Sequence, residues 1–276
     1  MQKVREMLPA YTQRATQEEE ILVRKILQKL QKGPFAKDVP VMSAKPEGRV
    51  ESGSHWVTWL LDGEEALAVQ VKDSGKTSDP MFFVLRSTDT VVRLKNVKCG
   101  FVSGPSRPTT VLRGTLAAKR TRWRNGHTSY ENERVATLQS MLPDGRRPAY
   151  DALPDSPCNL VFFATECFWW RTTVTEDFQG RMVQARILTE LGADQGSCYA
   201  SGFAAAANAP HIAYQPHMAP PQSLAVTRDV PRGLVGCSLR GLSLRPVDEA
   251  SHEPFDLAGA GEDDYEGTVK SLAVDK

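Results

Sequence analysis

The chain has little that would anchor it in a membrane or carry it out of the cell. Its first residues, Met1 to Glu6, contain no apolar h-region, so we expect no secretory signal. The longest apolar-looking stretch, residues 159–170, includes Glu166 and is too short to cross a bilayer. No Asn-x-Ser/Thr sequon occurs in the sequence. These absences favour an intracellular, cytoplasmic protein without an integral membrane segment.

Cysteine is scarce and irregularly placed. The five cysteines are an odd number, lie far apart and form no Cys-x-x-Cys pair. Disulfide frameworks and zinc fingers need cysteines at short regular spacings, so we interpret these as reduced, mostly buried thiols. His211 and His217 reach the outer limit of zinc-ligand spacing, but nothing pairs with them at a matching spacing. We therefore expect no metal and no cofactor.

No catalytic motif keeps its required spacing. Ser74-Gly75-Lys76-Thr77 resembles the end of a phosphate-binding loop, but Gln70 replaces the first glycine and Pro80 would interrupt the following helix. Residues 236–241 are one residue too long for a nucleophile elbow and predict a glycine-bounded strand instead. The chain is therefore not expected to be an enzyme of either kind.

Two further enzymatic interpretations are weak. Cys167 lies in an apolar run, which raises the pKa of a thiol, so core packing accounts for it better than nucleophilic catalysis. A site assembled from scattered residues such as His55, Glu166 or His211 stays an alternative that no spacing supports. The favoured classes are therefore non-enzymatic.

One amphipathic helix is clearly marked near the N-terminus. Thr16 and Glu19 match a capping box, and apolar residues then recur at three- and four-residue spacing from Ile21 to Leu30. Gly33-Pro34 ends the helix. We predict a helical N-terminal arm, residues 1–38, whose helix at 16–32 either packs on its own domain or associates with a second subunit.

Strand signals follow from Val39 onward. Short runs rich in β-branched and aromatic residues, separated by turn residues, predict one β domain over residues 39–257. The expected fold is mostly β: an antiparallel sandwich or jelly-roll-like barrel preceded by the amphipathic helix. Residues 258–276 consist largely of glycine, alanine and acids, and predict a disordered tail.

Turn residues set the expected strand pairs. Asp62-Gly63 predicts a tight hairpin between residues 55–61 and 64–71. Asn125-Gly126 predicts a second hairpin between residues 110–124 and 127–138, because both central positions must tolerate positive φ. Two further segments stay open: residues 159–174 fit one long strand or a strand pair, and residues 181–191 fit a strand or a helix.

Charge is segregated along the chain although the net charge is only +1. Residues 107–147 contain nine basic and three acidic side chains, whereas residues 248–276 contain nine acidic and two basic ones. A basic middle and an acidic tail favour either a polyanion partner or screening within one molecule. An uneven solvated surface is the alternative.

The hairpin at Asn125-Gly126 concentrates this positive charge. A two-residue loop there places Arg120, Arg122 and Arg124 on one face of the hairpin. Such a surface could hold phosphates and stack a base. Alternatively, the arginines only protect a sheet edge from aggregation. The candidate nucleic-acid-binding residues are Lys119, Arg120, Arg122, Trp123, Arg124, His127, Arg146 and Arg147.

A succession of short elements runs from residue 180 to 257. Arg181-Met182 follows an acidic Asp177, an alanine run at 204–207 follows Tyr199, and a strand containing Leu239-Arg240-Gly241 precedes Pro254 to Leu257. This succession resembles the plant-virus movement proteins of the thirty-kilodalton superfamily. The resemblance departs from the family pattern in two ways: the spacing after Asp177 suggests a turn, and an acidic tail replaces a basic C-terminal region.

The resemblance implies a jelly-roll-like β domain, cooperative binding of single-stranded RNA and association with host cell junctions. Together with the basic hairpin, it predicts a non-enzymatic viral or virus-like nucleic-acid-binding protein, in its most specific form a cell-to-cell movement protein. The alternative is a structural or assembly protein, such as a capsid, matrix or organellar subunit, that uses the β domain for protein contacts.

Overall fold

The computed structural model describes part of the chain, in two compact units. Unit 1 comprises Met1–Val39, Gly63–Ala118 and Asn159–Pro216, and unit 2 comprises Pro40–Asp62, Lys119–Cys158 and His217–Lys276. The described residues are 2–31, 55–71, 80–95, 109–120, 123–124, 127–128, 158–171, 173–175, 177–194, 211–217, 234, 237–247 and 255–256.

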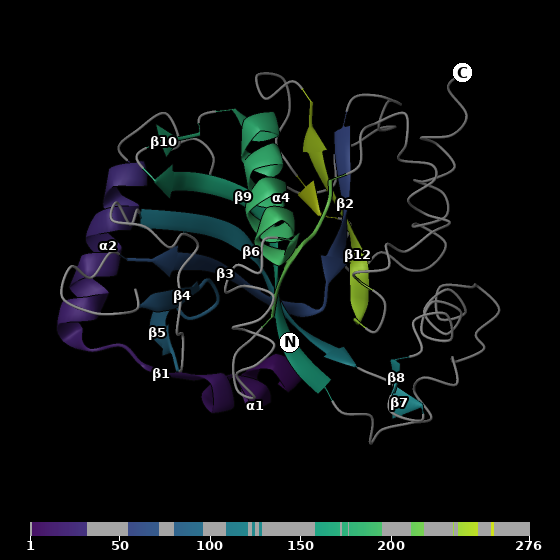
Figure 1. Ribbon diagram of the computed structural model, residues 1–276, viewed down its shortest axis with the longest axis horizontal. Helices are drawn as coiled ribbons and strands as arrows, with labels where there is room; N and C mark the ends of the chain where they lie inside the picture. The colour runs from purple at the N-terminus through teal and green to yellow at the C-terminus, as the bar shows by residue number, and fades with distance from the viewer. Residues whose placement is uncertain are drawn as a thin grey trace. The chain divides into compact units, whose positions relative to one another are not determined.

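An eight-stranded sheet is the centre of unit 1 (Figure 1). Its strand order is β1-β5-β4-β3-β6-β9-β10, and β11 also pairs with β9. The strands are β1 (Thr12–Arg14), β3 (Gly63–Gln70), β4 (Met81–Leu85), β5 (Thr90–Leu94), β6 (Thr109–Arg120), β9 (Cys158–Arg171), β10 (Thr173–Val174) and β11 (His211–Tyr214). Residues 159–174, which fitted one long strand or a strand pair, form the long β9 and the short β10, and β10 pairs antiparallel with the end of β9.

One pair in this sheet departs from the antiparallel prediction. β11 runs parallel to β9, with His211 beside Val161 and Tyr214 beside Ala164. A parallel partner needs a crossover connection, and the helix α4 (Phe178–Asp194) lies between the two strands in the sequence. Residues 181–191, which fitted either a strand or a helix, therefore form a helix.

The start of α4 explains the spacing after Asp177. The Asp177 carboxylate accepts a hydrogen bond from the Gly180 backbone N–H at 2.5 Å, and its carbonyl oxygen accepts one from the Arg181 N–H at 3.1 Å. Asp177 therefore caps the helix, where an acidic side chain also interacts favourably with the helix dipole. The residues after Asp177, where the spacing suggested a turn, are therefore the first turn of the helix α4.

Two helices lie near the N-terminus, one on each side of β1 in the sequence: α1 (Gln2–Tyr11) and α2 (Gln17–Gln31). The capping box predicted for α2 is present, because the Thr16 N–H donates to the Glu19 carboxylate at 2.9 Å and the Glu19 N–H donates to Thr16 Oγ1 at 3.3 Å. α1 was not predicted from the sequence. Its Val4 and Leu8 are buried, so it belongs to the folded unit.

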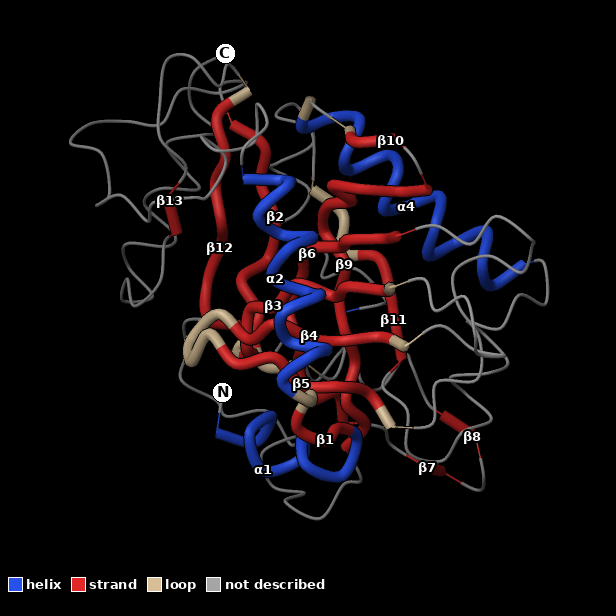
Figure 2. The backbone as a smooth tube through the Cα atoms, turned by 90° about the vertical axis from the view of Figure 1, so that its left-hand side faces the viewer, coloured by secondary structure: helices blue, strands red, loops and turns tan. Residues whose placement is uncertain are grey.

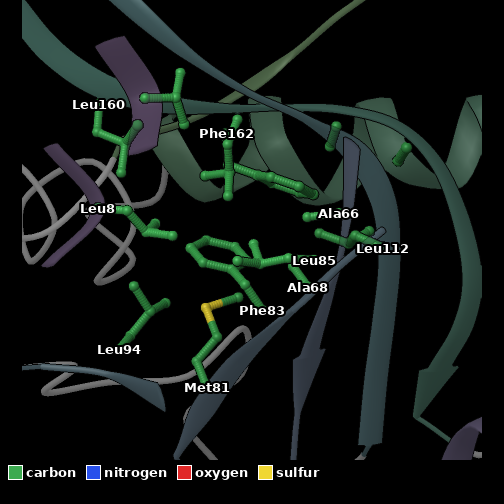
Figure 3. Packing of buried hydrophobic residues seen from close by; sticks show 14 of the residues in the cluster. Leu8, Ala66, Ala68, Met81, Phe83, Leu85, Leu94, Leu112, Leu160 and Phe162 are labelled. Atoms are coloured by element: carbon green, nitrogen blue, oxygen red, sulfur yellow. The ribbon is translucent and has the colours of Figure 1, made fainter. Parts of the chain in front are cut away.

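The sheet of unit 1 has a helix-covered core on each face. α1 and α4 contribute Val4, Leu8, Ala185 and Leu188 to one apolar cluster, together with alternate residues of the strands (Figure 3). α2 contributes Val23, Ile26 and Leu30 to a second cluster, with the strand residues that point the other way. Figure 2 shows α2 and α4 on opposite sides of the strands.

Unit 2 contains a three-stranded antiparallel sheet in the order β13-β12-β2. A separate pair of two-residue strands, β7 and β8, lies in the same unit. The strands are β2 (His55–Leu61), β12 (Leu239–Pro246), β13 (Phe255–Asp256), β7 (Trp123–Arg124) and β8 (His127–Thr128). β12 overlaps the predicted segment 236–241 only at residues 239–241, and Gly241 lies within the strand rather than at its end.

The hairpin predicted at Asp62-Gly63 is wrong. β2 pairs with β12, whereas β3 pairs with β4 and β6, so the two segments belong to different sheets. The Asp62 N–H donates to the Ser238 carbonyl at 2.8 Å. A Cβ atom at Gly63 would lie 2.2 Å from the Leu116 carbonyl oxygen, so this glycine permits close approach of two strands rather than a reverse turn.

The described residues thus form a mostly β structure with helices at its N-terminus, as expected. A sandwich or jelly-roll arrangement is not among the features that they show, and it stays a prediction, as do the domain boundaries. The tail at residues 258–276 and the phosphate-loop-like segment at Ser74-Gly75-Lys76-Thr77 lie outside the described residues.

Candidate nucleic-acid interface and buried ionic network

The basic hairpin begins at the end of β6. Lys119 and Arg120 are the last two residues of this strand, and Lys119 also forms an isolated antiparallel bridge with Cys237. Lys119 is half-buried. The first two candidate residues therefore continue a strand whose earlier residues, such as Leu112 and Leu116, are fully buried in unit 1.

The backbone of β7 and β8 pairs as the Asn-Gly turn requires. Trp123 lies opposite Thr128, and Arg124 lies opposite His127, so two residues separate the innermost pair. This register confirms the predicted hairpin at its innermost pairs. Arg122, Arg146 and Arg147 lie outside the described residues.

A buried ion pair is the most distinctive polar feature of unit 1. The Glu166 carboxylate in β9 accepts a hydrogen bond from Arg181 Nε of α4 at 3.0 Å and one from Arg113 Nη1 of β6 at 3.4 Å. Arg181 is 0% exposed and Glu166 is 2% exposed. Both charges are removed from water, so each depends on the other for its stability in the interior.

Two aromatic rings complete the surroundings of Arg181. The guanidinium carbon lies 5.1 Å from the centre of the Phe168 ring and 5.9 Å from that of Phe178. A guanidinium near the face of a ring is attracted by its quadrupole, and the attraction is stronger when water is absent. Arg181 therefore joins α4 to β9 by a charge and by packing.

The ion pair continues as a row of alternating charges across the sheet. Arg113 Nη2 lies 3.9 Å from the Glu65 carboxylate of β3, and Glu65 also forms an ion pair with Arg86. Each acid in this row therefore lies between two arginines. The row crosses the strands in the order β9, β6 and β3, which ties together segments far apart in the sequence.

Other acids of unit 1 are paired in the same way. Arg24 binds Asp89 at 3.0 Å and Glu20 at 2.9 Å. These neighbouring carboxylates raise the pKa of Arg24, with the Glu20 hydrogen bond as the largest cause. Two more pairs are Arg93 with Glu19 at 2.5 Å and Arg5 with Glu64 at 3.8 Å. Six acids of unit 1 thus already face arginines of the same unit.

These pairs affect the enzymatic alternative. Glu166 is held between two arginines, an arrangement that favours a structural carboxylate over a proton-transfer group. His55 begins β2 of unit 2, and His211 begins β11 of unit 1. Within the described ranges, no group of three or more His, Cys, Asp or Glu side chains could hold a metal ion. The helices described here include none that is both long and apolar enough to span a membrane.

Cys167 is buried beside Glu166 in β9, and burial raises the pKa of its thiol from 9.0 to about 12. The folded state keeps the neutral thiol, whereas the unfolded state ionises above pH 9, so this group destabilises the fold as the pH rises from about 9 towards 12. At pH 10 the expected cost relative to pH 8 is about 1.4 kcal/mol.

Urea unfolding under reducing conditions measures this effect. The loss of unfolding free energy between pH 8 and pH 10 should be smaller by that amount in Cys167→Ala than in the wild-type chain. Equal losses in the two proteins would show that the thiol titrates normally in the fold.

Sequence reasoning missed the ionic network but had a signal for it. Glu166 is the one acid in an apolar run of twelve residues at 159–170. A charge in the middle of a buried strand needs a partner, so this residue alone predicts a buried cation nearby. The sequence did not identify Arg113 or Arg181 as that partner, because both are distant from Glu166 along the chain.

No protein-family model matches this chain, and no curated protein matches it either.

Proposed function

We propose that the chain is a non-enzymatic nucleic-acid-binding protein that holds phosphates with its basic hairpin. The hairpin is defined as residues 119–128, and we propose that Arg146 and Arg147 also bind the nucleic acid. The observation that carries the proposal is the pairing of Arg124 with His127, which is the register of a tight turn at Asn125-Gly126. Arg120, Arg122 and Arg124 lie within five residues of the sequence, directly before Asn125-Gly126.

The charge balance supports the proposal. Of the nine basic side chains between residues 107 and 147, Arg113 is paired with Glu65 and Glu166. The six paired acids of unit 1 already face other partners, namely Arg5, Arg24, Arg86, Arg93, Arg113 and Arg181. These acids have arginine partners within unit 1, and the excess of basic side chains between residues 107 and 147 makes a polyanion a suitable partner.

The movement-protein resemblance gives the proposal a more specific form. It implies a viral protein with a jelly-roll-like domain that binds single-stranded RNA cooperatively and acts at host cell junctions. Arginines that contact phosphates read no sequence, and a tryptophan at the hairpin could stack an unpaired base. Single-stranded RNA without sequence preference is therefore the proposed ligand.

An electrophoretic shift with single-stranded RNA at low salt tests the proposal. We expect a retarded band that weakens steeply as salt is added, because each neutralised phosphate releases a counterion. Duplex RNA of the same length should bind less well, because its bases are not available for stacking. A wild-type chain that leaves single-stranded RNA unshifted at low salt would exclude this function and favour the assembly-protein alternative.

A further inference from the structure

α2 has apolar residues on two faces. Val23, Ile26 and Leu30 point into the core of unit 1, whereas the neighbouring Ile21 and Leu22 are 47% and 44% exposed. Packing on its own sheet therefore accounts for only part of the apolar surface of the helix. Two large apolar side chains of α2 are therefore left partly exposed next to each other.

One charged residue precedes this exposed pair in the helix and another, of opposite charge, follows it. Glu18 precedes it and Lys25 follows it, and both are exposed. The four residues 18, 21, 22 and 25 recur at three- and four-residue spacing, so they form one stripe along the helix. Among the residues that the structure describes, neither Glu18 nor Lys25 has an ion-pair partner.

Neighbouring charges on the same helix behave differently. Glu19 pairs with Arg93, and Arg24 pairs with both Glu20 and Asp89, so these side chains fasten α2 to the strands of unit 1. The charges of α2 thus divide into a set that binds the unit and a set that faces outward. The outward set has one acid, Glu18, at its N-terminal end and two bases, Lys25 and Lys29, towards its C-terminal end.

We propose that the outward stripe of α2 binds the same stripe of a second copy of this chain, with the two helices antiparallel. Glu18 and Lys25 are equally distant from the midpoint between Ile21 and Leu22. A two-fold axis at that midpoint packs Ile21 of each copy against Leu22 of the other. It also pairs each Glu18 with the opposite Lys25, so the stripe is complementary to itself.

The antiparallel direction follows from the same charges. A parallel pairing would set Glu18 against Glu18 and Lys25 against Lys25, which is repulsive. The antiparallel pairing makes two attractive contacts and also opposes the two helix dipoles. The occupant is therefore a second copy, and a dimer of this kind needs no nucleic acid.

Charge reversal tests the dimer by sedimentation equilibrium of the full chain without nucleic acid. We expect Glu18→Lys and Lys25→Glu each to weaken dimerisation by about tenfold, because each reversal turns two exposed attractive pairs into repulsive ones. The double variant E18K/K25E should regain most of the affinity, because its charges are complementary again. Ile21→Gln should weaken the dimer by more, about 100-fold, because the axis buries this residue twice.

Val183→Gln is the matched control. Val183 is 50% exposed on α4, so this change removes a similar apolar surface away from the stripe and should leave the dimer unchanged. A monomeric wild-type chain at the highest soluble concentration would overturn the proposal. The proposal would also be overturned if Glu18→Lys and Lys25→Glu each left the dimer affinity unchanged, or if E18K/K25E dimerised no more tightly than the single variants. RNA binding is measured separately, so a failure here leaves the proposed function standing.

Discussion

Replacing Arg181 by leucine is expected to lower the free energy of unfolding by about 3–5 kcal/mol. The change leaves the Glu166 carboxylate, 2% exposed, without the cation that lies 3.0 Å away. Arg113 remains 3.4 Å from the Glu166 carboxylate, but it also forms an ion pair with Glu65. Leucine also ends the attraction to the rings of Phe168 and Phe178. Urea unfolding followed by circular dichroism measures the change.

Two further variants separate the ion pair from simple packing. Arg186→Leu changes an exposed arginine of the same helix and should have a small effect. The double variant E166L/R181L removes both charges and should recover much of the stability that Arg181→Leu loses, because no buried charge is left unpaired. A double variant less stable than Arg181→Leu would show that Glu166 contributes to the fold independently of this arginine.

Removing the three hairpin arginines is expected to have the largest effect on RNA binding. In R120A/R122A/R124A, three phosphate contacts are lost, so the slope of log affinity against log salt should become shallower by about 2 for single-stranded RNA. Affinity at low salt should fall by about 100-fold or more, because three phosphate contacts are lost together. Fluorescence anisotropy with a labelled single-stranded RNA measures both quantities.

The matched control removes the same net charge elsewhere. Lys3, Arg14 and Lys29 are exposed basic residues of unit 1, outside the hairpin. The variant K3A/R14A/K29A should keep most of the affinity and the salt slope of the wild-type chain. Equal losses in the two triple variants would mean that net charge, rather than the hairpin, attracts the nucleic acid.

Local signals in the sequence predicted local structure well. The capping box at Thr16 and Glu19 depends only on neighbouring residues, and the structure has both of its hydrogen bonds. The Asn125-Gly126 turn is likewise local, because its demand for positive φ leaves few alternatives. Its register is present in the pairing of β7 with β8. Apolar length also identified β9 as a buried strand.

The hairpin prediction at Asp62-Gly63 failed because a glycine can serve either a tight turn or the close approach of two strands. Asp62-Gly63 is typical of a tight turn, but Gly63 is needed because it lies against the Leu116 carbonyl of β6. Nothing in the flanking residues distinguishes a glycine for a turn from one for close packing. α1 contains Pro9, which usually interrupts a helix, so the sequence signal for this helix is weak.

The direction of β11 and the partners of Glu166 depend on the tertiary fold. β11 is parallel to β9, and the segment between them that forms α4 fitted a strand or a helix from its sequence. The candidate interface was predicted from turn chemistry and charge alone. The ionic network was not, because Arg113, Glu166 and Arg181 come together only when β6, β9 and α4 pack.

The most direct measurement of the central claim is the salt dependence of single-stranded RNA binding by the wild-type chain and by R120A/R122A/R124A. The account predicts tight binding at low salt by the wild-type chain and a shallower salt slope in the variant. Identical slopes for the two proteins, at equal stability, would contradict it, because the hairpin arginines would then contact no phosphate.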